Sequence, residues 1–150
     1  MLESEIPPLD MIVRLLMAAG LALLLGLERE LRRKPAGLRS HMLVSVGAAA
    51  FILIGLHILM TTAEGDPSAR IDPSRIVEGV IGGIGFLGAG CIIQSRGSVQ
   101  GITTGASIWI SGAIGVACGL GTLVLATMVT VLALIIVVGL GRFERDVIEE

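Results

Sequence analysis

Two charged residues stand inside apolar runs, where an ionisable group can serve a cation or a proton. Arg14 lies one turn into the first run, and Glu78 lies near the start of the third. A charge within the hydrocarbon costs about 2.5 to 3.5 kcal/mol on insertion scales, so each needs a partner or water. We expect an Arg14–Glu78 pair at similar depth. It is either a polar site open to the outer face, with Glu78 available to a cation or proton, or a structural ion pair or snorkelling near the interface.

A second polar group is expected at the opposite membrane face. Glu28 and Glu30 end the first apolar run, His41 begins the second, and Arg96 follows the third. Their cluster is interpreted as a gate, a cation site or a docking surface, and the alternative is ordinary solvation at the interface. Mg²⁺ keeps several waters and takes one or two carboxylates. Glu28 and Glu78 are therefore candidates to line a hydrated path, although they lie at opposite ends of their spans.

Glycines are unusually frequent in the third apolar run. Residues 79 and 83 form a small-xxx-small pair of the kind that lets helix backbones approach closely in lipid. We expect mostly packing within the chain, with a homo-oligomer or a partner helix as the alternative. The glycines assigned to helix packing are Gly79, Gly82, Gly83, Gly85, Gly88 and Gly90.

The sequence shows no pattern typical of an enzyme. It lacks a His/Cys metal cluster, a nucleotide-binding glycine loop and a nucleophile–base pairing. We therefore expect no catalytic residues, no resident cofactor and no nucleic-acid partner, with Mg²⁺ considered only as a ligand or a transported ion.

The elements that position these residues are membrane-spanning helices. Of the 150 residues, 53% are hydrophobic and only 16% are charged, and the mean hydropathy is +0.89. A soluble domain of this size cannot bury so much apolar side chain. We predict an all-α integral membrane protein in a single domain, 1–150, with the lipid bilayer as its environment. Its five spans cover residues 11–27, 41–60, 76–94, 104–120 and 122–140.

Local signals mark the connections. Asp10, Ser40 and Asp72 are placed to cap the first, second and third helices, and Pro73 follows Asp72 as a helix-start signal. Residues 95–104 are predicted to form a tight hairpin turn, with a re-entrant turn as the alternative. Cys91 and Cys118 fall near opposite faces and are expected to be unpaired thiols.

The basic residues predict the orientation. Loops rich in Lys and Arg stay in the cytoplasm, and eight bases fall on one predicted side against two on the other. The N-terminus is therefore expected outside and the C-terminus in the cytoplasm. The eight are Arg29, Arg32, Arg33, Lys34, Arg39, Arg96, Arg142 and Arg145, and the two are Arg70 and Arg75.

Four segments together resemble the MgtC/SapB family over about residues 10 to 140. They are Gly-Leu-Glu-Arg-Glu (26–30), Lys-Pro-Ala-Gly-Leu-Arg-Ser-His-Met-Leu-Val (34–44), Gly-Ile-Gly-Phe-Leu-Gly-Ala-Gly (83–90) and Arg-Gly-Ser-Val-Gln-Gly-Ile-Thr-Thr-Gly-Ala-Ser-Ile-Trp (96–109). The resemblance implies a bacterial cytoplasmic-membrane protein associated with growth under magnesium limitation and with virulence inside host cells. It also implies regulation of other membrane machinery, including the ATP synthase.

The same resemblance implies which polar residues belong to the family's cytoplasmic loops. Those of its first loop are Glu28, Arg29, Arg39 and His41, and those of its second are Arg96, Thr103, Thr104 and Trp109. The chain ends soon after the fifth predicted span, without the cytosolic C-terminal domain of longer members, so functions of that domain are not expected here.

Three functions follow as hypotheses. The first is a non-enzymatic membrane factor in adaptation to magnesium limitation or intracellular stress, acting through membrane partners. The second is a transporter that moves magnesium or another cation past Glu78 and Glu28. The third is an assembly subunit that uses the glycine face.

Overall fold

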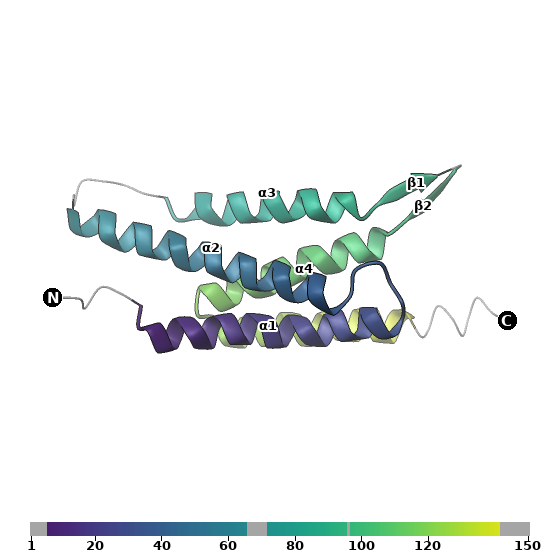
Figure 1. Ribbon diagram of the computed structural model, residues 1–150, viewed down its shortest axis with the longest axis horizontal. Helices are drawn as coiled ribbons and strands as arrows, with labels where there is room; N and C mark the ends of the chain where they lie inside the picture. Colours follow the sequence, from purple (N-terminus) through teal and green to yellow (C-terminus); the bar gives the residue numbers. More distant parts are fainter. Residues whose placement is uncertain (1–5, 66–71, 96, 142–150) are drawn as a thin grey trace.

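Long helices make up most of the computed structural model (Figure 1), which describes residues 6–65, 72–95 and 97–141. Along the chain the elements are α1 (Pro8–Leu31), α2 (Leu38–Gly65), α3 (Ser74–Gly90), β1 (Ile93–Ser95), β2 (Ser98–Gln100), α4 (Ile102–Gly119), α5 (Leu123–Leu134) and the π-helix η1 (Ile135–Leu140). The helices lie roughly alongside one another, and the all-α membrane fold predicted from composition is confirmed.

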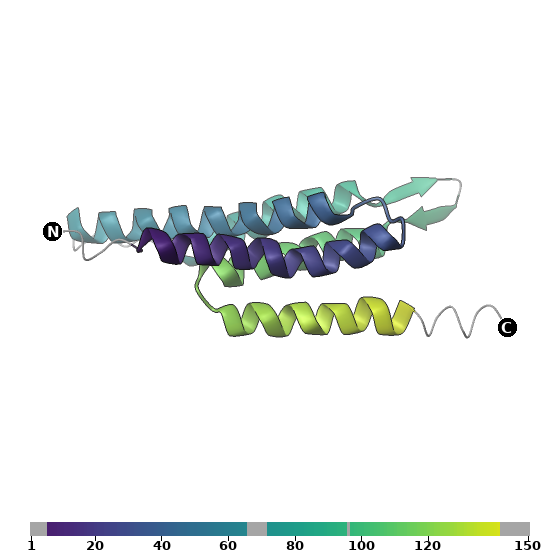
Figure 2. The same cartoon turned by 60° about the horizontal axis from the view of Figure 1, so that its bottom comes forward.

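The centre of the bundle is α4, which packs against α1, α2, α3 and α5. Figure 2 shows α5 and η1 along one edge of the bundle. Small side chains let the helices approach, and the central cluster consists largely of them, being Ala18, Ala49, Ile114, Ala117, Cys118 and Ala126. A Cβ added to Gly115 of α4 would lie 2.1 Å from the Ser45 carbonyl oxygen of α2, so close backbone packing holds these two helices together.

Within the described part of the chain, four stretches are long and apolar enough to cross a membrane: Pro8–Leu31, Leu38–Thr62, Ile102–Gly119 and Leu123–Leu140. With 17 residues, α3 rises only about 25 Å, somewhat less than the roughly 30 Å hydrocarbon core. The predicted third span, 76–94, is too long, because the helix ends at Gly90 and a β-strand begins at Ile93. The count of five spans therefore stays a prediction.

A short antiparallel hairpin joins α3 to α4, and its strands pair Ile93 with Gln100 and Ser95 with Ser98. It extends beyond the helix ends (Figure 1). Gly97 and Gly101 have φ values of 86° and 87°, which favour glycine. The predicted hairpin turn is therefore drawn out into two strands, and α4 starts at Ile102.

None of the three predicted residues occupies an N-cap position, although Asp72 still bonds the start of α3, whose N-cap is Pro73. The Asp72 carboxylate accepts a hydrogen bond from the Ser74 amide at 2.9 Å, and hydrogen bonds from the side chain and amide of Ser74 lower the pKa of Asp72. In α1, which begins at Pro8 with Pro7 as its N-cap and without a side-chain cap, Asp10 lies inside the first turn and pairs with Arg14. Ser40 lies inside α2, which begins two residues earlier. Cys91 and Cys118 are free thiols, as expected.

Candidate functional site at the basic end of the bundle

The end of α1, the start of α2 and the start of α4 meet at one end of the bundle, beside the Arg-rich loop of residues 32–37 (Figure 1). We call this the basic end. Helix periodicity explains why polar residues enter the bundle here. The buried positions of α1 are Ala18, Ala22, Leu25, Gly26 and Arg29, spaced three and four residues apart along one face.

Buried hydrogen bonds connect the three helices. Arg29 is 3% exposed, and its Nη2 donates to Thr104 Oγ1 of α4 at 2.9 Å. His41 of α2 is fully buried, with Nδ1 2.7 Å from the Gly37 carbonyl oxygen and Nε2 3.0 Å from Ser107 Oγ. The Ser107 hydroxyl donates its proton to the Thr104 carbonyl oxygen at 2.8 Å. The network fixes the relative positions of α1, α2 and α4.

Two carboxylates of α1 have separate roles at this end. Glu28 has a side chain only 10% exposed, and its Oε1 pairs with Arg32 Nε, while its Oε2 has no hydrogen-bond partner among the described residues. Glu30 Oε2 accepts the Leu38 amide at 3.0 Å, so it binds the first amide of α2. Glu30 therefore stabilises the turn between the helices.

A cavity of about 950 Å³ opens between the end of α1, the start of α4 and η1. Its polar wall contains Glu28, Arg29, Arg32, Lys34, Gln100, Thr103 and Thr104, and its apolar wall contains Ile136, Val137 and Leu140. Three bases face one carboxylate, and one oxygen of that carboxylate is already paired with Arg32. The surroundings therefore favour an anion over a cation.

Other predicted residues lie apart from this cavity or outside the described part of the chain. Arg39 is exposed on the first turn of α2 and is absent from the cavity wall. Arg96, expected in the same cluster, lies outside the described residues. The network also includes Ser107, which contacts His41, and Ser111, whose hydroxyl donates to the Ser107 carbonyl oxygen. Neither serine was predicted as a functional residue from the sequence. Thr104, Ser107 and Ser111 are spaced three and four residues apart, and this spacing indicates that their hydroxyls lie on one face of the helix.

The predicted Arg14–Glu78 pair is wrong. Arg14 Nη2 lies 2.7 Å from Asp10 Oδ2, and its Nη1 donates to the Gly119 carbonyl oxygen at 2.8 Å. Glu78 is exposed on α3. The reason is the arrangement of the helices, because α3 packs against α4 and α2, whereas α1 packs against α2, α4 and α5.

The two candidate metal ligands do not come together. Glu28 lies in the last turn of α1, at the basic end, and Glu78 lies in the second turn of α3. The start of α3 is at the opposite end of the bundle (Figure 1). Among the described residues, no group of three His, Cys, Asp or Glu side chains is placed to hold a metal ion.

Most of the glycines assigned to packing leave α3 open. Only Gly88 packs closely within the chain, since a Cβ added there would lie 3.1 Å from the Gly105 carbonyl oxygen of α4. A Cβ added at any of the others would meet nothing within 4 Å, and these are Gly79, Gly82, Gly83, Gly85 and Gly90. The expected packing within the chain is therefore wrong for these five.

Comparison with known proteins supports the family resemblance. The model of the MgtC family matches residues 15–146. "Protein MgtC" of Salmonella typhimurium (strain LT2) is 41% identical over 133 residues, covering 89% of this chain and 53% of that protein. "Putative magnesium transporter YhiD" of Escherichia coli (strain K12) is 37% identical over 127 residues, covering 85% of this chain and 59% of that protein.

The chain thus spans somewhat more than half the length of these curated relatives. No solved structure matches it. The family match covers most of the chain and includes all four long apolar helices in whole or in large part. The chain belongs to the MgtC family and is a multi-pass protein of the inner membrane.

Proposed function

We propose that the protein is a non-enzymatic membrane factor that supports adaptation to magnesium limitation or intracellular stress by acting on another membrane protein. The observation that carries the proposal is the open glycine face of α3. Gly79 and Gly83 are exposed and one helical turn apart. In lipid, such a pair allows a second helix to approach the backbone closely.

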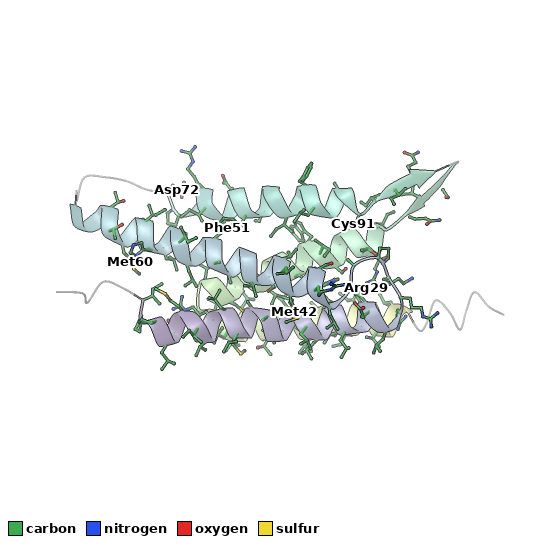
Figure 3. All side chains as sticks on the ribbon, viewed as in Figure 1. Arg29, Met42, Phe51, Met60, Asp72 and Cys91 are labelled. Carbon is green, nitrogen blue, oxygen red and sulfur yellow. The ribbon has the colours of Figure 1, made fainter. Side chains whose placement is uncertain are left out.

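A groove beside this face has room for a partner. It has a volume of about 770 Å³ and is lined by apolar residues of α2 and α3, including Phe51, Ile54, Gly79 and Gly83. Phe51, labelled in Figure 3, is 61% exposed at the groove. A transmembrane helix of the partner would cover these side chains. The family resemblance suggests the ATP synthase as one such partner, and a second copy of the chain is the alternative occupant.

Transport of Mg²⁺ is the rival function, and the relative from Escherichia coli bears the name of a putative magnesium transporter. The unpartnered Glu28 Oε2 favours this alternative. The separation of Glu28 from Glu78 and the Glu28–Arg32 pair support the partner-based role instead.

Complementation tests the proposed role. A strain lacking the gene is grown at low magnesium with wild type, Gly83→Leu or the control Gly20→Leu, each at equal membrane abundance. Gly20 of α1 is also exposed and has nothing within 4 Å of an added Cβ. We expect Gly83→Leu to lose complementation and Gly20→Leu to retain it. Equal growth of both variants would contradict a role for the α3 face.

Flux into proteoliposomes separates the two functions. Purified wild type, Glu28→Gln and Glu78→Gln are compared for Mg²⁺ uptake with and without an imposed membrane potential. The proposal expects no uptake above that of empty liposomes. Saturable uptake that either substitution reduces would establish transport in its place.

A further inference from the structure

The cavity at the basic end contains a buried guanidinium, that of Arg29, which forms no salt bridge among the described residues; Glu28 acts on it electrostatically but is paired with Arg32. Arg29 is 3% exposed, its Nε has no hydrogen-bond partner, and its Nη2 bonds only a neutral hydroxyl, that of Thr104. Among the described residues, the ion pairs are Arg14–Asp10 and Arg32–Glu28. Burying a charge without a salt bridge is unfavourable in free energy, so an anion bound beside this guanidinium would be stabilising.

Backbone donors lie beside that guanidinium. The first main-chain bond of α4 runs from the Gly105 amide to the Gly101 carbonyl oxygen at 2.8 Å, so the amides of residues 102–104 have no partner within the helix. No side chain of residues 6–65, 72–95 or 97–141 caps the start of this 18-residue helix. Arg29, labelled in Figure 3, is held against it through Thr104. The guanidinium and the positive end of the α4 dipole thus act on the same space.

Gly101 keeps this helix start open. Its φ is 87°, and a Cβ there would lie 2.0 Å from the Cys91 carbonyl oxygen. A residue such as Ser or Asp, whose side chain could cap the helix, would therefore displace the hairpin if it replaced Gly101. The turn that connects β2 to α4 therefore explains why the amides of residues 102–104 have no side-chain cap.

From these observations we propose that the cavity binds a phosphate group, which accepts hydrogen bonds from Arg29 and from the amides at the start of α4, with Lys34 at the edge of the site. Helix N-termini with a nearby base are suited to phosphate. The phosphate comes from an anionic phospholipid or from free phosphate. The apolar wall formed by Ile136, Val137 and Leu140 of η1 offers a surface for the acyl chain of a lipid.

Binding to the purified full-length chain in detergent tests the site. Native mass spectrometry measures binding of dioctanoyl-phosphatidylglycerol and of dioctanoylglycerol, which has the same chains but no phosphate. Equilibrium dialysis measures binding of inorganic phosphate. Phosphatidylglycerol binding without dioctanoylglycerol binding identifies a lipid phosphate. Binding of inorganic phosphate with comparable affinity identifies free phosphate, and both results support the site.

Variants assign the binding to this cavity. Arg29→Gln is expected to weaken it about tenfold or more, which is the scale of one charge-assisted hydrogen bond. Arg33→Gln is the matched control, because Arg33 is an exposed base of the same loop outside the cavity wall, and it should change affinity less than about twofold. Lys34→Gln alters an exposed residue and reports on the cavity even if Arg29→Gln fails to fold.

The proposal is overturned if neither phosphate compound binds. It is also overturned if Lys34→Gln or folded Arg29→Gln weakens binding no more than Arg33→Gln does, since that result indicates attraction to the basic loop in general. The test does not depend on the α3 face, so its outcome leaves the proposed partner-based function to be judged separately.

Discussion

At the scale of single residues, His41 connects three parts of the chain at one buried point. Its ring lies between the Gly37 carbonyl oxygen and the Ser107 hydroxyl. Gly26 of α1 comes so close that an added Cβ would lie 3.2 Å from the His41 Cβ. Loss of the imidazole therefore removes two hydrogen bonds and opens a cavity between helices.

We expect His41→Ala to lower the free energy of unfolding by about 2 to 4 kcal/mol, from lost hydrogen bonds and an unfilled cavity. The measurement is thermal or denaturant unfolding of the purified protein in detergent. The other histidine provides the control, because His57 is exposed near the far end of α2, and His57→Ala should leave the midpoint within error. Equal shifts for the two variants would contradict a structural role for the network.

A double-mutant cycle checks which carboxylate Arg14 uses. The cycle between Arg14→Gln and Asp10→Asn should give a coupling energy of about 0.3 to 1 kcal/mol, because Asp10 is partly exposed and the pair is partly screened. The cycle between Arg14→Gln and Glu78→Gln should give zero within error. Coupling of Arg14 to Glu78 would instead restore the pair that the sequence suggested.

Arg29 and Arg14 show which parts of the site can be predicted from the sequence and which cannot. Periodicity alone places Arg29 on the buried face of α1, four residues after Leu25 and seven after Ala22, once the helix is extended beyond residue 27. Because the predicted first span ended at residue 27, Arg29 was assigned to the following loop together with the other bases. The Arg14–Glu78 prediction failed for a different reason, since equal depth in a membrane does not say which helices are neighbours.

At the scale of helices, α3 and α4 are both glycine-rich but pack differently. Gly115 of α4 meets the Ser45 carbonyl oxygen of α2, whereas Gly83 of α3 faces open space. Composition does not separate these cases, because the small-residue pattern is the same for a face that packs internally and for one that awaits a partner. The predicted third helix likewise extended through Ile92 and Ile93, because hydropathy alone does not distinguish a helix from an apolar strand.

Alanine substitutions measure this difference. Gly115→Ala places a methyl group against a backbone carbonyl, so α2 must shift, and we expect a loss of about 1 to 3 kcal/mol in unfolding free energy. Gly83→Ala meets nothing within 4 Å and should leave stability unchanged or slightly higher. Detergent unfolding curves of the two variants provide the comparison. A large loss for Gly83→Ala would mean that α3 packs against its own chain.

At the scale of the whole molecule, composition predicts the solvent but not the number of crossings. The described chain enters and leaves the bundle at opposite ends (Figure 1), as the predicted outside-to-cytoplasm path requires. The element that decides the number of crossings is α3, which has 17 residues and an exposed carboxylate, Glu78, in its second turn. A glutamate one turn from a helix end can reach the interface, so its presence is compatible with a short span.

Cysteine accessibility in intact cells decides the path of α3. In a background of Cys91→Ser and Cys118→Ala, single cysteines are introduced as Lys34→Cys, Asp72→Cys and Val99→Cys, and a membrane-impermeant maleimide is applied before and after permeabilisation. The base distribution predicts that Lys34→Cys is labelled only after permeabilisation and Asp72→Cys before it. If α3 crosses the membrane, Asp72→Cys and Val99→Cys, which lie before and after this helix, are labelled on opposite sides, and Val99→Cys behaves like Lys34→Cys because both residues line the cavity at the basic end. Labelling of Asp72→Cys and Val99→Cys on the same side would remove α3 from the spans.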